Sequence, residues 1–172
     1  MMKTKILITG AFNAGKTTFI RSISEIDPVF TDKKMLENEE LTTVAMDFGR
    51  ITVDEELSLY LFGTPGQERF DFMWDILKED IIGFVLLVDS INPEVDSALN
   101  ILEFLTGRTD APYVIACTKQ DHANALPLET IRKSLELDNV PLLPCVATDR
   151  ESVKKVLLVL LREIMEKMDG KT

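Results

Sequence analysis

The segment GAFNAGKT, from Gly10 to Thr17, restricts the possible folds of this chain more than any other stretch. It has the form G-x-x-x-x-G-K-[ST], and it lies between a β-type run, KTKILIT, and a helix-like run that begins at Thr17. In such a unit the glycines let backbone N–H groups converge on phosphate oxygens at the positive end of the helix. Lys16 would then reach the β and γ phosphates, and the Thr17 hydroxyl would ligate Mg²⁺. The segment predicts a site for a nucleoside triphosphate or diphosphate, with an ordinary glycine turn as the alternative.

The composition of the chain limits the kinds of molecule that it could bind besides a nucleotide. The chain has 172 residues and a formal net charge of −10, which fits one domain and disfavours nucleic acid or an anionic membrane as a partner. No apolar run approaches the roughly 20 residues needed to span a bilayer. Met2 and the ending MDGKT provide no myristoylation or prenylation site, so we expect a cytoplasmic protein without a lipid anchor. Cys117 and Cys145 lie in apolar runs and are expected to be buried thiols.

Strand-like and helix-like runs alternate along the rest of the chain. Residues 44–53 and 56–62 predict two strands joined as an antiparallel hairpin, and residues 81–88 and 112–118 are continuously apolar, as expected of parallel strands covered on both faces. The polar segment Asp27–Thr43 predicts a functional loop, and residues 71–80 are weakly helical. The alternation predicts a three-layer α/β domain with a mostly parallel sheet over residues 1–172.

Two further helices have recognisable ends. Asn92 and Pro93 predict the start of one helix and Gly107 its end. Thr148 and Glu151 form a possible capping box before the last helix. Apolar residues then follow at helical spacing: Val153, Val156, Leu157, Leu160, Leu161, Ile164, Met165 and Met168.

The segment CTKQD, from Cys117 to Asp121, follows a predicted buried strand, where an open α/β sheet binds its ligand. The Asp121 carboxylate can accept hydrogen bonds from the ring N–H and the exocyclic amine of guanine, whereas adenine would turn a lone pair toward it. We therefore expect guanine, with Lys119 lying along the base and bracing the phosphate loop, and Thr118 tying the two loops together. An ordinary solvated loop is the alternative reading of this segment alone.

These motifs together resemble those of the Ras-like small GTPases. GAFNAGKT resembles the phosphate loop, TTVAMDF the first switch, GTPGQERF the second switch and TKQD the guanine motif, while CVATD lies at the position of the fifth motif. The TPGQ segment, the missing lipid site and Gly63 make the overall pattern closest to the prokaryotic small GTPases, including the MglA type. The resemblance implies a P-loop NTPase G domain, whose mostly parallel sheet has about six strands, one of them antiparallel.

The resemblance also implies a role for individual residues. Thr43 would join Thr17 as a ligand of Mg²⁺, Gly66 would donate its N–H to the γ-phosphate, and Gln67 would orient the attacking water as the catalytic residue. The expected contacts of GTP or GDP are Asn13, Ala14, Gly15, Lys16, Thr17, Thr18, Phe30, Thr43, Gly66, Thr118, Lys119, Asp121, Val146 and Ala147.

Gly63 departs from this family pattern, because small GTPases usually have there an aspartate that supports Mg²⁺. The retention of Lys16, Thr17 and Gln67 indicates a local loss rather than a dead domain. Asp47 is a candidate surrogate, although Rab proteins have a similar aspartate beside a normal second switch.

Phe12 is a second departure, since Ras has glycine there, and it predicts a different activating protein. Arg50 and Arg69 could assist catalysis in cis or could be surface charges, and His122 is expected at the surface. The segments Asp27–Thr43 and Gly63–Trp74 are the expected surfaces for effectors and regulators. The second segment includes an apolar cluster of Phe70, Phe72, Met73 and Trp74.

Three functions fit these observations. The first is a GTPase switch with slow hydrolysis. The second is a nucleotide-dependent protein-binding module with negligible hydrolysis, which Gly63 and Phe12 favour. The third is a P-loop kinase or ATPase, which the TKQD segment disfavours. The sequence identifies neither a particular partner nor an oligomeric state.

Overall fold

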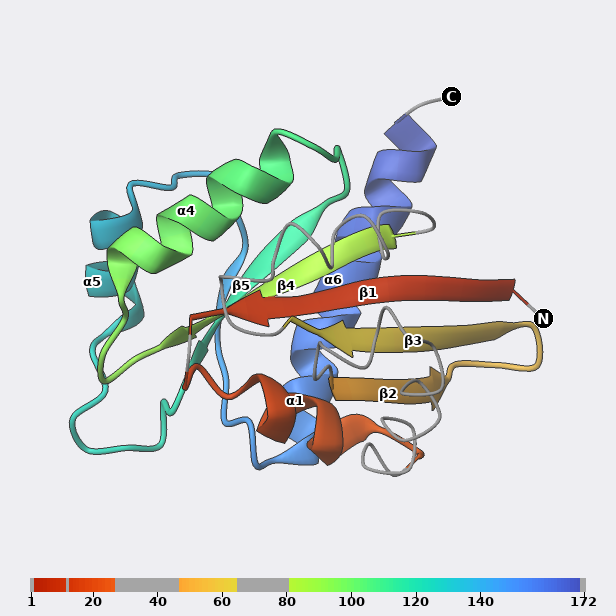
Figure 1. The fold of residues 1–172 in the computed structure, drawn as a ribbon, viewed down its shortest axis with the longest axis horizontal. Coiled ribbons are helices and arrows are strands. Elements are labelled where there is room, and N and C mark those ends of the chain that lie inside the picture. Colours follow the sequence, from red (N-terminus) through yellow and green to blue (C-terminus); the bar gives the residue numbers. More distant parts are fainter. Residues whose placement is uncertain (1, 12, 27–46, 65–80, 171–172) are drawn as a thin grey trace, which may run out of the picture.

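The computed structural model describes residues 2–11, 13–26, 47–64 and 81–170. These residues build a six-stranded sheet in the order β2-β3-β1-β4-β5-β6 (Figure 1). The strands are β1 (Met2–Gly10), β2 (Asp47–Thr52), β3 (Leu57–Gly63), β4 (Ile81–Asp89), β5 (Tyr113–Thr118) and β6 (Leu142–Pro144). The predicted loop at 27–43 and the predicted weak helix at 71–80 lie outside the described residues.

All neighbouring strands are parallel except β2 and β3, which confirms the mostly parallel sheet with one antiparallel strand. β2 and β3 form the predicted hairpin. Asp54 closes its turn, because Asp54 Oδ1 accepts hydrogen bonds from the N–H groups of Glu56 at 2.8 Å and Leu57 at 2.9 Å. In this register Gly63 of β3 lies opposite Asp47.

The helices lie on both faces of the sheet, which confirms the three layers (Figure 1). α1 (Lys16–Ile23) and α6 (Arg150–Gly170) pack on one face. α4 (Val95–Thr106) and α5 (Leu128–Leu135) pack on the other face. β4 therefore buries both of its faces, and its continuous apolar sequence follows from this position.

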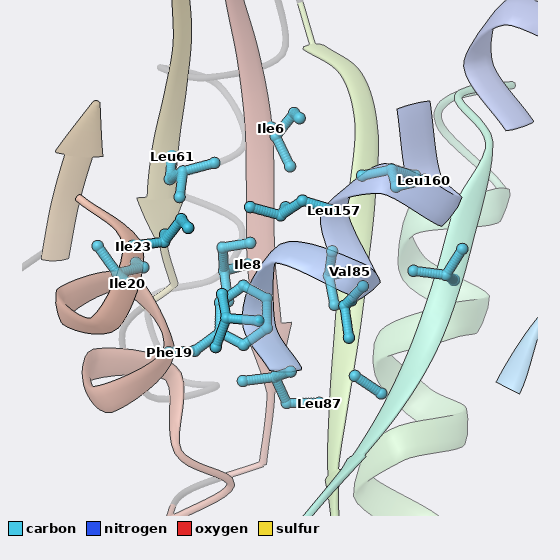
Figure 2. Close-up of a cluster of buried hydrophobic side chains, with 14 of the residues drawn as sticks. Ile6, Ile8, Phe19, Ile20, Ile23, Leu61, Val85, Leu87, Leu157 and Leu160 are labelled. Atoms are coloured by element: carbon cyan, nitrogen blue, oxygen red, sulfur yellow. The ribbon is translucent and has the colours of Figure 1, made fainter. Parts of the chain in front are cut away.

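Figure 2 shows the core between the sheet and the helices α1 and α6. Phe19 and Ile20 of α1 and Leu160 of α6 meet Ile8 and Val85 of the central strands there, and all five side chains are 0% exposed. Burial of large apolar side chains is the main stabilising contribution to such a layer. The sheet, α1 and α6 are thus held together at the base of the predicted phosphate loop.

The two predicted helix starts need correction. α4 ends at Gly107 as predicted, but it begins at Val95 rather than after Asn92. Asp89 explains the difference, because its Oδ1 accepts hydrogen bonds from the N–H groups of Ile91 at 2.8 Å and Asn92 at 3.3 Å. The chain therefore makes a turn at Asn92 before the helix can start.

At the start of α6, Asp149 takes the capping role that the sequence assigned to Thr148. Asp149 Oδ1 accepts a hydrogen bond from the N–H of Glu151 at 3.1 Å, and Ser152 Oγ accepts one from the N–H of Val146 at 2.8 Å. Val153, Val156, Leu157, Leu160 and Ile164 form the buried face of this helix as their spacing predicts. Met165 and Met168 do not join them, since they are 63% and 65% exposed.

Both cysteines are free, buried thiols, as predicted. Burial raises the pKa of Cys117 to about 12 and that of Cys145 to about 11. No helix within the described ranges is both long and apolar enough to cross a membrane.

Candidate nucleotide-binding site

The predicted phosphate loop leaves β1 in a conformation that requires glycine. Gly10 has a φ of +149°, and a Cβ atom added there would lie 2.5 Å from the carbonyl oxygen of Leu87 in β4. Asn13 and Gly15 also have positive φ values, 69° and 101°. The loop therefore folds tightly against the end of β4 and then turns directly into α1.

The first turn of α1 is prepared for an anion. Gly15 is the N-cap residue, no side chain caps the helix, and its first turn has no acidic residue. The positive end of the helix dipole and the first N–H groups are thus not neutralised by a carboxylate of this helix. Lys16 begins the helix, and its Nζ donates hydrogen bonds to the carbonyl oxygens of Gly10 at 2.8 Å and Ala11 at 3.0 Å. Its ammonium group therefore lies over the phosphate loop.

The guanine motif is tied to this loop at the end of β5, as predicted. The single hydroxyl hydrogen of Thr118 is shared between the carbonyl oxygens of Ala14, 2.9 Å from Oγ1, and Val88, 3.3 Å from Oγ1. Thr118 is buried, so these bonds satisfy a hydroxyl that would otherwise be costly to bury. The bonds hold the phosphate loop and the predicted base-binding segment at a fixed separation.

Lys119 has a contact that the sequence did not predict. Its Nζ lies 2.6 Å from Asp89 Oδ2, whereas the sequence predicted contacts with the base and the phosphate loop. Burial alone would raise the pKa of the Asp89 carboxyl. The hydrogen bonds from Lys119 and from the N–H groups of Ile91 and Asn92 outweigh burial and hold the pKa of Asp89 below its usual value. Asp89 thus joins the predicted base-binding segment to the turn after β4.

Asp121 lies in the turn that follows, which is held by its neighbours. Gln120 Nε2 donates a hydrogen bond to Ser90 Oγ at 2.6 Å, and the N–H of His122 donates one to the carbonyl oxygen of Lys119 at 3.0 Å. Asp121 itself is exposed at the carboxyl-end edge of the sheet, where a ligand can reach it. His122 is exposed, as expected.

The predicted fifth motif reaches the same place from the other side. Ser22 Oγ of α1 donates a hydrogen bond to the carbonyl oxygen of Ala147. A Cβ atom added to Gly15 would lie 3.7 Å from Ala147 Cβ and 3.9 Å from Thr118 Cγ2. The phosphate loop, the guanine motif and the segment with Val146 and Ala147 therefore meet around Gly15.

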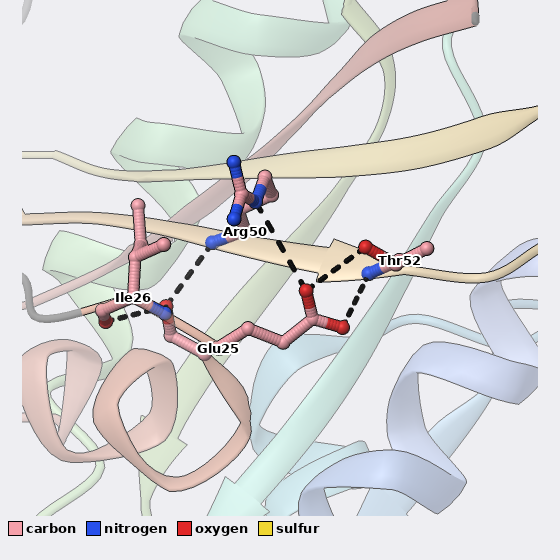
Figure 3. Close-up of polar contacts among 5 residues, drawn as sticks. Glu25, Ile26, Arg50 and Thr52 are labelled. Atoms are coloured by element: carbon pink, nitrogen blue, oxygen red, sulfur yellow. Dashed lines mark hydrogen bonds and ion pairs between the residues drawn. The ribbon is translucent and has the colours of Figure 1, made fainter.

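The chain that leaves α1 is fastened to β2 (Figure 3). Glu25 Oε1 accepts a hydrogen bond from the N–H of Thr52 at 2.7 Å, and Glu25 Oε2 accepts one from Thr52 Oγ1 at 2.9 Å. Ser24 Oγ accepts a hydrogen bond from the N–H of Arg50 at 3.1 Å. The side chain of Arg50 lies 4.0 Å from Glu25 Oε2 as an ion pair at the surface. The residues just before the predicted first-switch region, Ser24 and Glu25, are thus bonded to the strand that follows this region, β2.

The described residues fit a nucleotide better than they define a metal site. Thr17 is half-buried in the first turn of α1, at the positive end of the helix where a phosphate-bound cation would lie. No group of three or more His, Cys, Asp or Glu residues that could hold a metal ion occurs in the part of the chain that the structure describes. Several predicted residues lie outside that part: Phe12, Phe30, Thr43, Gly66, Gln67, Arg69, Phe70, Phe72, Met73 and Trp74.

Asp89 is the residue of this region that sequence reasoning missed. It ends a continuously apolar strand, IIGFVLLVD, and a charged residue at that position is a signal that something at the carboxyl edge of the sheet requires it. Its partner Lys119 lies thirty residues further along the chain, so only the paired strands β4 and β5 reveal the contact.

Comparisons with known proteins agree with this arrangement. A family model described as "Conserved hypothetical ATP binding protein" matches residues 28–167. The chain is 32% identical over 122 residues to the uncharacterized protein MJ1339 of Methanocaldococcus jannaschii, covering 69% of this chain and 71% of that protein.

Two relatives with informative names are similar over nearly the whole chain. The mutual gliding-motility protein MglA of Myxococcus xanthus is 27% identical over 178 residues, covering 93% of this chain and 91% of MglA. The Ras-related protein Rab-27A of Rattus norvegicus is 25% identical over 186 residues, covering 96% of this chain and 80% of Rab-27A. The chain therefore belongs to the family described as conserved hypothetical ATP binding protein, and it is a Ras-like small GTPase with MglA among its relatives.

Proposed function

We propose that this protein is a molecular switch that binds GTP or GDP with Mg²⁺ and hydrolyses GTP slowly to GDP and phosphate. The observation that carries the proposal is the meeting of three segments around Gly15. Thr118 of the guanine motif bonds to Ala14 of the phosphate loop, and Ala147 lies beside Gly15. One nucleotide could touch all three segments, with its phosphates on the loop and its base between the other two.

The phosphate end follows from the start of α1. Backbone N–H groups from Asn13 to Thr18 would donate to phosphate oxygens, and the ammonium of Lys16 would exchange its carbonyl contacts for the β and γ phosphates. A charged phosphate is a stronger acceptor than a neutral carbonyl, so this exchange favours binding. Thr17 would direct its hydroxyl oxygen to the cation beside the phosphates.

The base end favours guanine through Asp121. The Asp121 carboxylate would accept two hydrogen bonds from guanine, whereas adenine would leave a charged acceptor without donors, at a cost of a few kcal/mol. The N–H of Ala147 would donate to the guanine carbonyl oxygen, and Phe30 would stack on the base. The description of the matching family names ATP, and this proposal differs from it for this chain on the chemistry of Asp121.

Mg²⁺, when bound, would neutralise charge on the β and γ phosphates. We expect Thr17 and Thr43 to supply the protein oxygens, because Gly63 offers none beyond its backbone. The register of the hairpin supports Asp47 as the substitute for the missing aspartate, since Asp47 lies directly opposite Gly63.

For hydrolysis, Gln67 would orient the attacking water and Gly66 would bind the γ-phosphate. With no arginine assigned to the transferred phosphate, we expect a rate on the order of 10⁻⁴ per second without a partner. Effectors and regulators would bind the segments Asp27–Thr43 and Gly63–Trp74. Loss of the γ-phosphate would release these segments and so change the surface that the partners bind. We expect this switch to act in the cytoplasm.

A second candidate is a nucleotide-dependent protein-binding module whose hydrolysis is negligible. Gly63 favours it, because the end of β3 lacks the usual side chain that supports the metal. Both candidates require nucleotide binding, and they differ only in the rate of the chemical step.

Single-turnover hydrolysis of GTP tests the proposal and separates the two candidates. We expect slow conversion to GDP by the protein alone, and loss of most of any partner-stimulated rate in Gln67→Leu with unchanged GTP binding. Lys16→Ala is the matched control for binding, because it should fold normally and bind GTP far more weakly. A folded Lys16→Ala variant with unchanged GTP affinity would contradict the phosphate-loop assignment. A wild-type protein that never converts GTP would favour the binding module.

A further inference from the structure

Side chains continue the pairing of β4 and β5 beyond the end of the sheet. The last paired residues of the two strands are Asp89 and Thr118. One step further, the N–H of Ser90 donates a hydrogen bond to the carbonyl oxygen of Thr118 at 3.0 Å. Gln120 then reaches back to the turn after β4, because its Nε2 lies 2.6 Å from Ser90 Oγ. This turn is therefore attached to the predicted base-binding segment by side chains as well as by the backbone.

Ser90 is fully enclosed at this position. It is 0% exposed, whereas serine residues are mostly found at the surface of a protein. Its carbonyl oxygen accepts a hydrogen bond from the N–H of Leu126 at 2.8 Å, in addition to the bonds of its N–H and its hydroxyl. A buried hydroxyl is costly unless it is hydrogen-bonded, so Ser90 requires a partner such as Gln120.

Gln120 holds the predicted base-binding segment on two sides. The two hydrogens of its Nε2 have two acceptors, Ser90 Oγ and the carbonyl oxygen of Leu126 at 3.3 Å. On the other side, its N–H donates a hydrogen bond to the carbonyl oxygen of Cys145 at 3.3 Å. Cys145 lies two residues before Ala147 of the predicted fifth motif. Gln120 thus connects the two segments that are expected to contact the base.

The position of Asp121 depends on the turn that carries it. Asp121 is exposed, so packing against the core does not hold its side chain. The turn is closed by the hydrogen bond from the N–H of His122 to the carbonyl oxygen of Lys119 at 3.0 Å. Gln120 is the residue inside this turn that binds the rest of the molecule. A shift of Gln120 would therefore move Asp121 with it.

Selection of guanine requires an accurate position of the Asp121 carboxylate. The carboxylate would accept one hydrogen bond from the ring N–H and a second from the exocyclic amine. Hydrogen bonds weaken steeply when their distance or angle departs from the preferred values. Residues that hold the turn can therefore determine specificity without touching the base.

We propose that Ser90 and Gln120 are positioning residues for the selection of guanine. The hydrogen bond between Ser90 Oγ and Gln120 Nε2 holds the turn so that the Asp121 carboxylate can reach the exocyclic amine of the base. The inference rests on the proposed function, and it assigns part of the specificity to two residues outside the expected nucleotide contacts.

The neighbouring pair of Asp89 and Lys119 is a less suitable place to test this idea. Lys119 Nζ lies 2.6 Å from Asp89 Oδ2, one residue before the contact of Ser90 with Gln120. Because Lys119 is itself expected to lie along the base, a change at either residue would alter binding directly. Ser90 and Gln120 act only through the turn.

The ratio of the affinities for GTP and ITP measures the proposed role. ITP has the triphosphate and the ring N–H of GTP but lacks the exocyclic amine, so the ratio reports the second hydrogen bond of Asp121. The wild type should bind GTP at least about tenfold more tightly than ITP, as expected of one hydrogen bond to a charged group. Ser90→Ala and Gln120→Met should each reduce this ratio at least about threefold. Methionine keeps the unbranched shape of glutamine and has no donor.

The double variant separates positioning from stability. Gln120→Met leaves the buried hydroxyl of Ser90 without its glutamine partner, whereas Ser90→Ala/Gln120→Met removes both groups. The double variant should therefore be at least as stable as Gln120→Met in chemical denaturation. Its GTP to ITP ratio should nevertheless be as low as in the single variants, because all three lack the same hydrogen bond.

Thr4→Val is the matched control for loss of a buried hydroxyl. Thr4 is 7% exposed, and its Oγ1 donates a hydrogen bond to the carbonyl oxygen of Ser58 at 3.3 Å near the start of β1, away from the predicted base-binding segment. This variant should keep the wild-type ratio even if it is less stable. Asp121→Ala gives the other limit, a ratio of about one.

The possible results are distinguishable by isothermal titration. Variants of Ser90 and Gln120 that weaken GTP and ITP binding in the same proportion would overturn the inference and leave the proposed function intact. Effects of the two single changes that add in the double variant would also overturn it, since their shared hydrogen bond would not be the cause. A wild type that binds GTP and ITP equally would contradict the selection of guanine, and the inference with it.

Discussion

At the scale of single residues, two glycines in the phosphate loop are required for different reasons. At Gly10 a side chain would meet the backbone of β4, because an added Cβ would lie 2.5 Å from the carbonyl oxygen of Leu87. At Gly15 an added Cβ would make only ordinary van der Waals contacts, the nearest at 3.7 Å, and the constraint is the φ of +101°. The first position therefore combines a steric conflict with backbone strain, and the second has strain alone.

We expect Gly10→Ala to destabilise the protein more than Gly15→Ala. Backbone strain in Gly15→Ala should lower the free energy of unfolding by about 1–3 kcal/mol. In Gly10→Ala the new side chain would in addition have to displace the backbone of β4, which increases the loss. Gly170→Ala is the control, since an added Cβ there meets nothing within 4 Å. Chemical denaturation of the three variants measures the order. Equal stability of Gly10→Ala and Gly170→Ala would contradict the described packing of the loop.

The ion pair between Asp89 and Lys119 predicts a pH-dependent stability. Asp89→Asn keeps an oxygen for the N–H groups of Ile91 and Asn92 and removes only the charge that faces Lys119. Because the folded-state pKa of Asp89 is lowered, its contribution is present above its unfolded pKa of about 4 and is lost as the pH falls through the folded value.

Asp89→Asn should therefore be less stable than the wild type at pH 7, by about 1 kcal/mol after allowing for the partial exposure of Lys119. The difference should shrink as the pH falls below the unfolded pKa and disappear once the pH is below the lowered folded-state pKa of Asp89. Urea unfolding of both proteins across this range checks the prediction. A difference that is the same at both ends of the range would rule out the charge of Asp89 as its source.

At the scale of elements, the junction between α1 and β2 connects the phosphate loop to the hairpin. Glu25 holds Thr52 by two hydrogen bonds, and the N–H of Glu25 donates a third bond to the carbonyl oxygen of Arg50 at 2.8 Å. Gly49 lets the strand approach this closely, because a Cβ there would lie 2.7 Å from Ile20 Cγ2. The edge strand β2 is thus positioned by α1 as well as by β3.

Glu25→Gln should loosen this junction without unfolding the protein. The hydrogen bonds from Thr52 lower the pKa of Glu25, so its stabilising effect exists above its unfolded pKa and is lost as the pH falls through the lowered value. Glu25 is exposed, and we expect a loss below about 1 kcal/mol at pH 7. Hydrogen exchange should be faster at the N–H of Thr52, with the β1 amides as an unchanged reference. Unchanged exchange at Thr52 would contradict the junction.

Local patterns predicted the elements of this fold better than their ends. The apolar run of β4 and the turn residues of the hairpin are sufficient to predict those strands, because a buried parallel strand and an antiparallel hairpin each have a distinct sequence pattern. The predicted start of α4 was wrong by a few residues. The reason is that Asp89, at the end of the preceding strand, accepts hydrogen bonds from the N–H groups of Ile91 and Asn92. The predicted N-cap residue of α6 was wrong because two neighbouring residues, Thr148 and Asp149, could each cap this helix, and Asp149 does so.

At the scale of the whole molecule, the site depends on segments that are distant in the sequence. Motif spacing predicted the bond between Thr118 and the phosphate loop, because both segments end strands at the same edge of the sheet. It could not predict the pair of Lys119 with Asp89, which requires the register of β4 and β5. The exposure of Met165 and Met168 was also hidden, because helical periodicity alone does not tell which apolar residues face the sheet.

The central claim is that Asp121 selects guanine, and a comparison of GTP, ATP and XTP affinities for the wild type and Asp121→Asn tests it most directly. The wild type should bind GTP at least about a hundredfold more tightly than ATP or XTP. Asp121→Asn should lose GTP affinity and gain XTP affinity, because an amide can donate to the C2 carbonyl oxygen of xanthine where the carboxylate accepted from the guanine amine. Equal GTP and ATP affinities in the wild type, or an Asp121→Asn variant with the wild-type preference, would contradict this account.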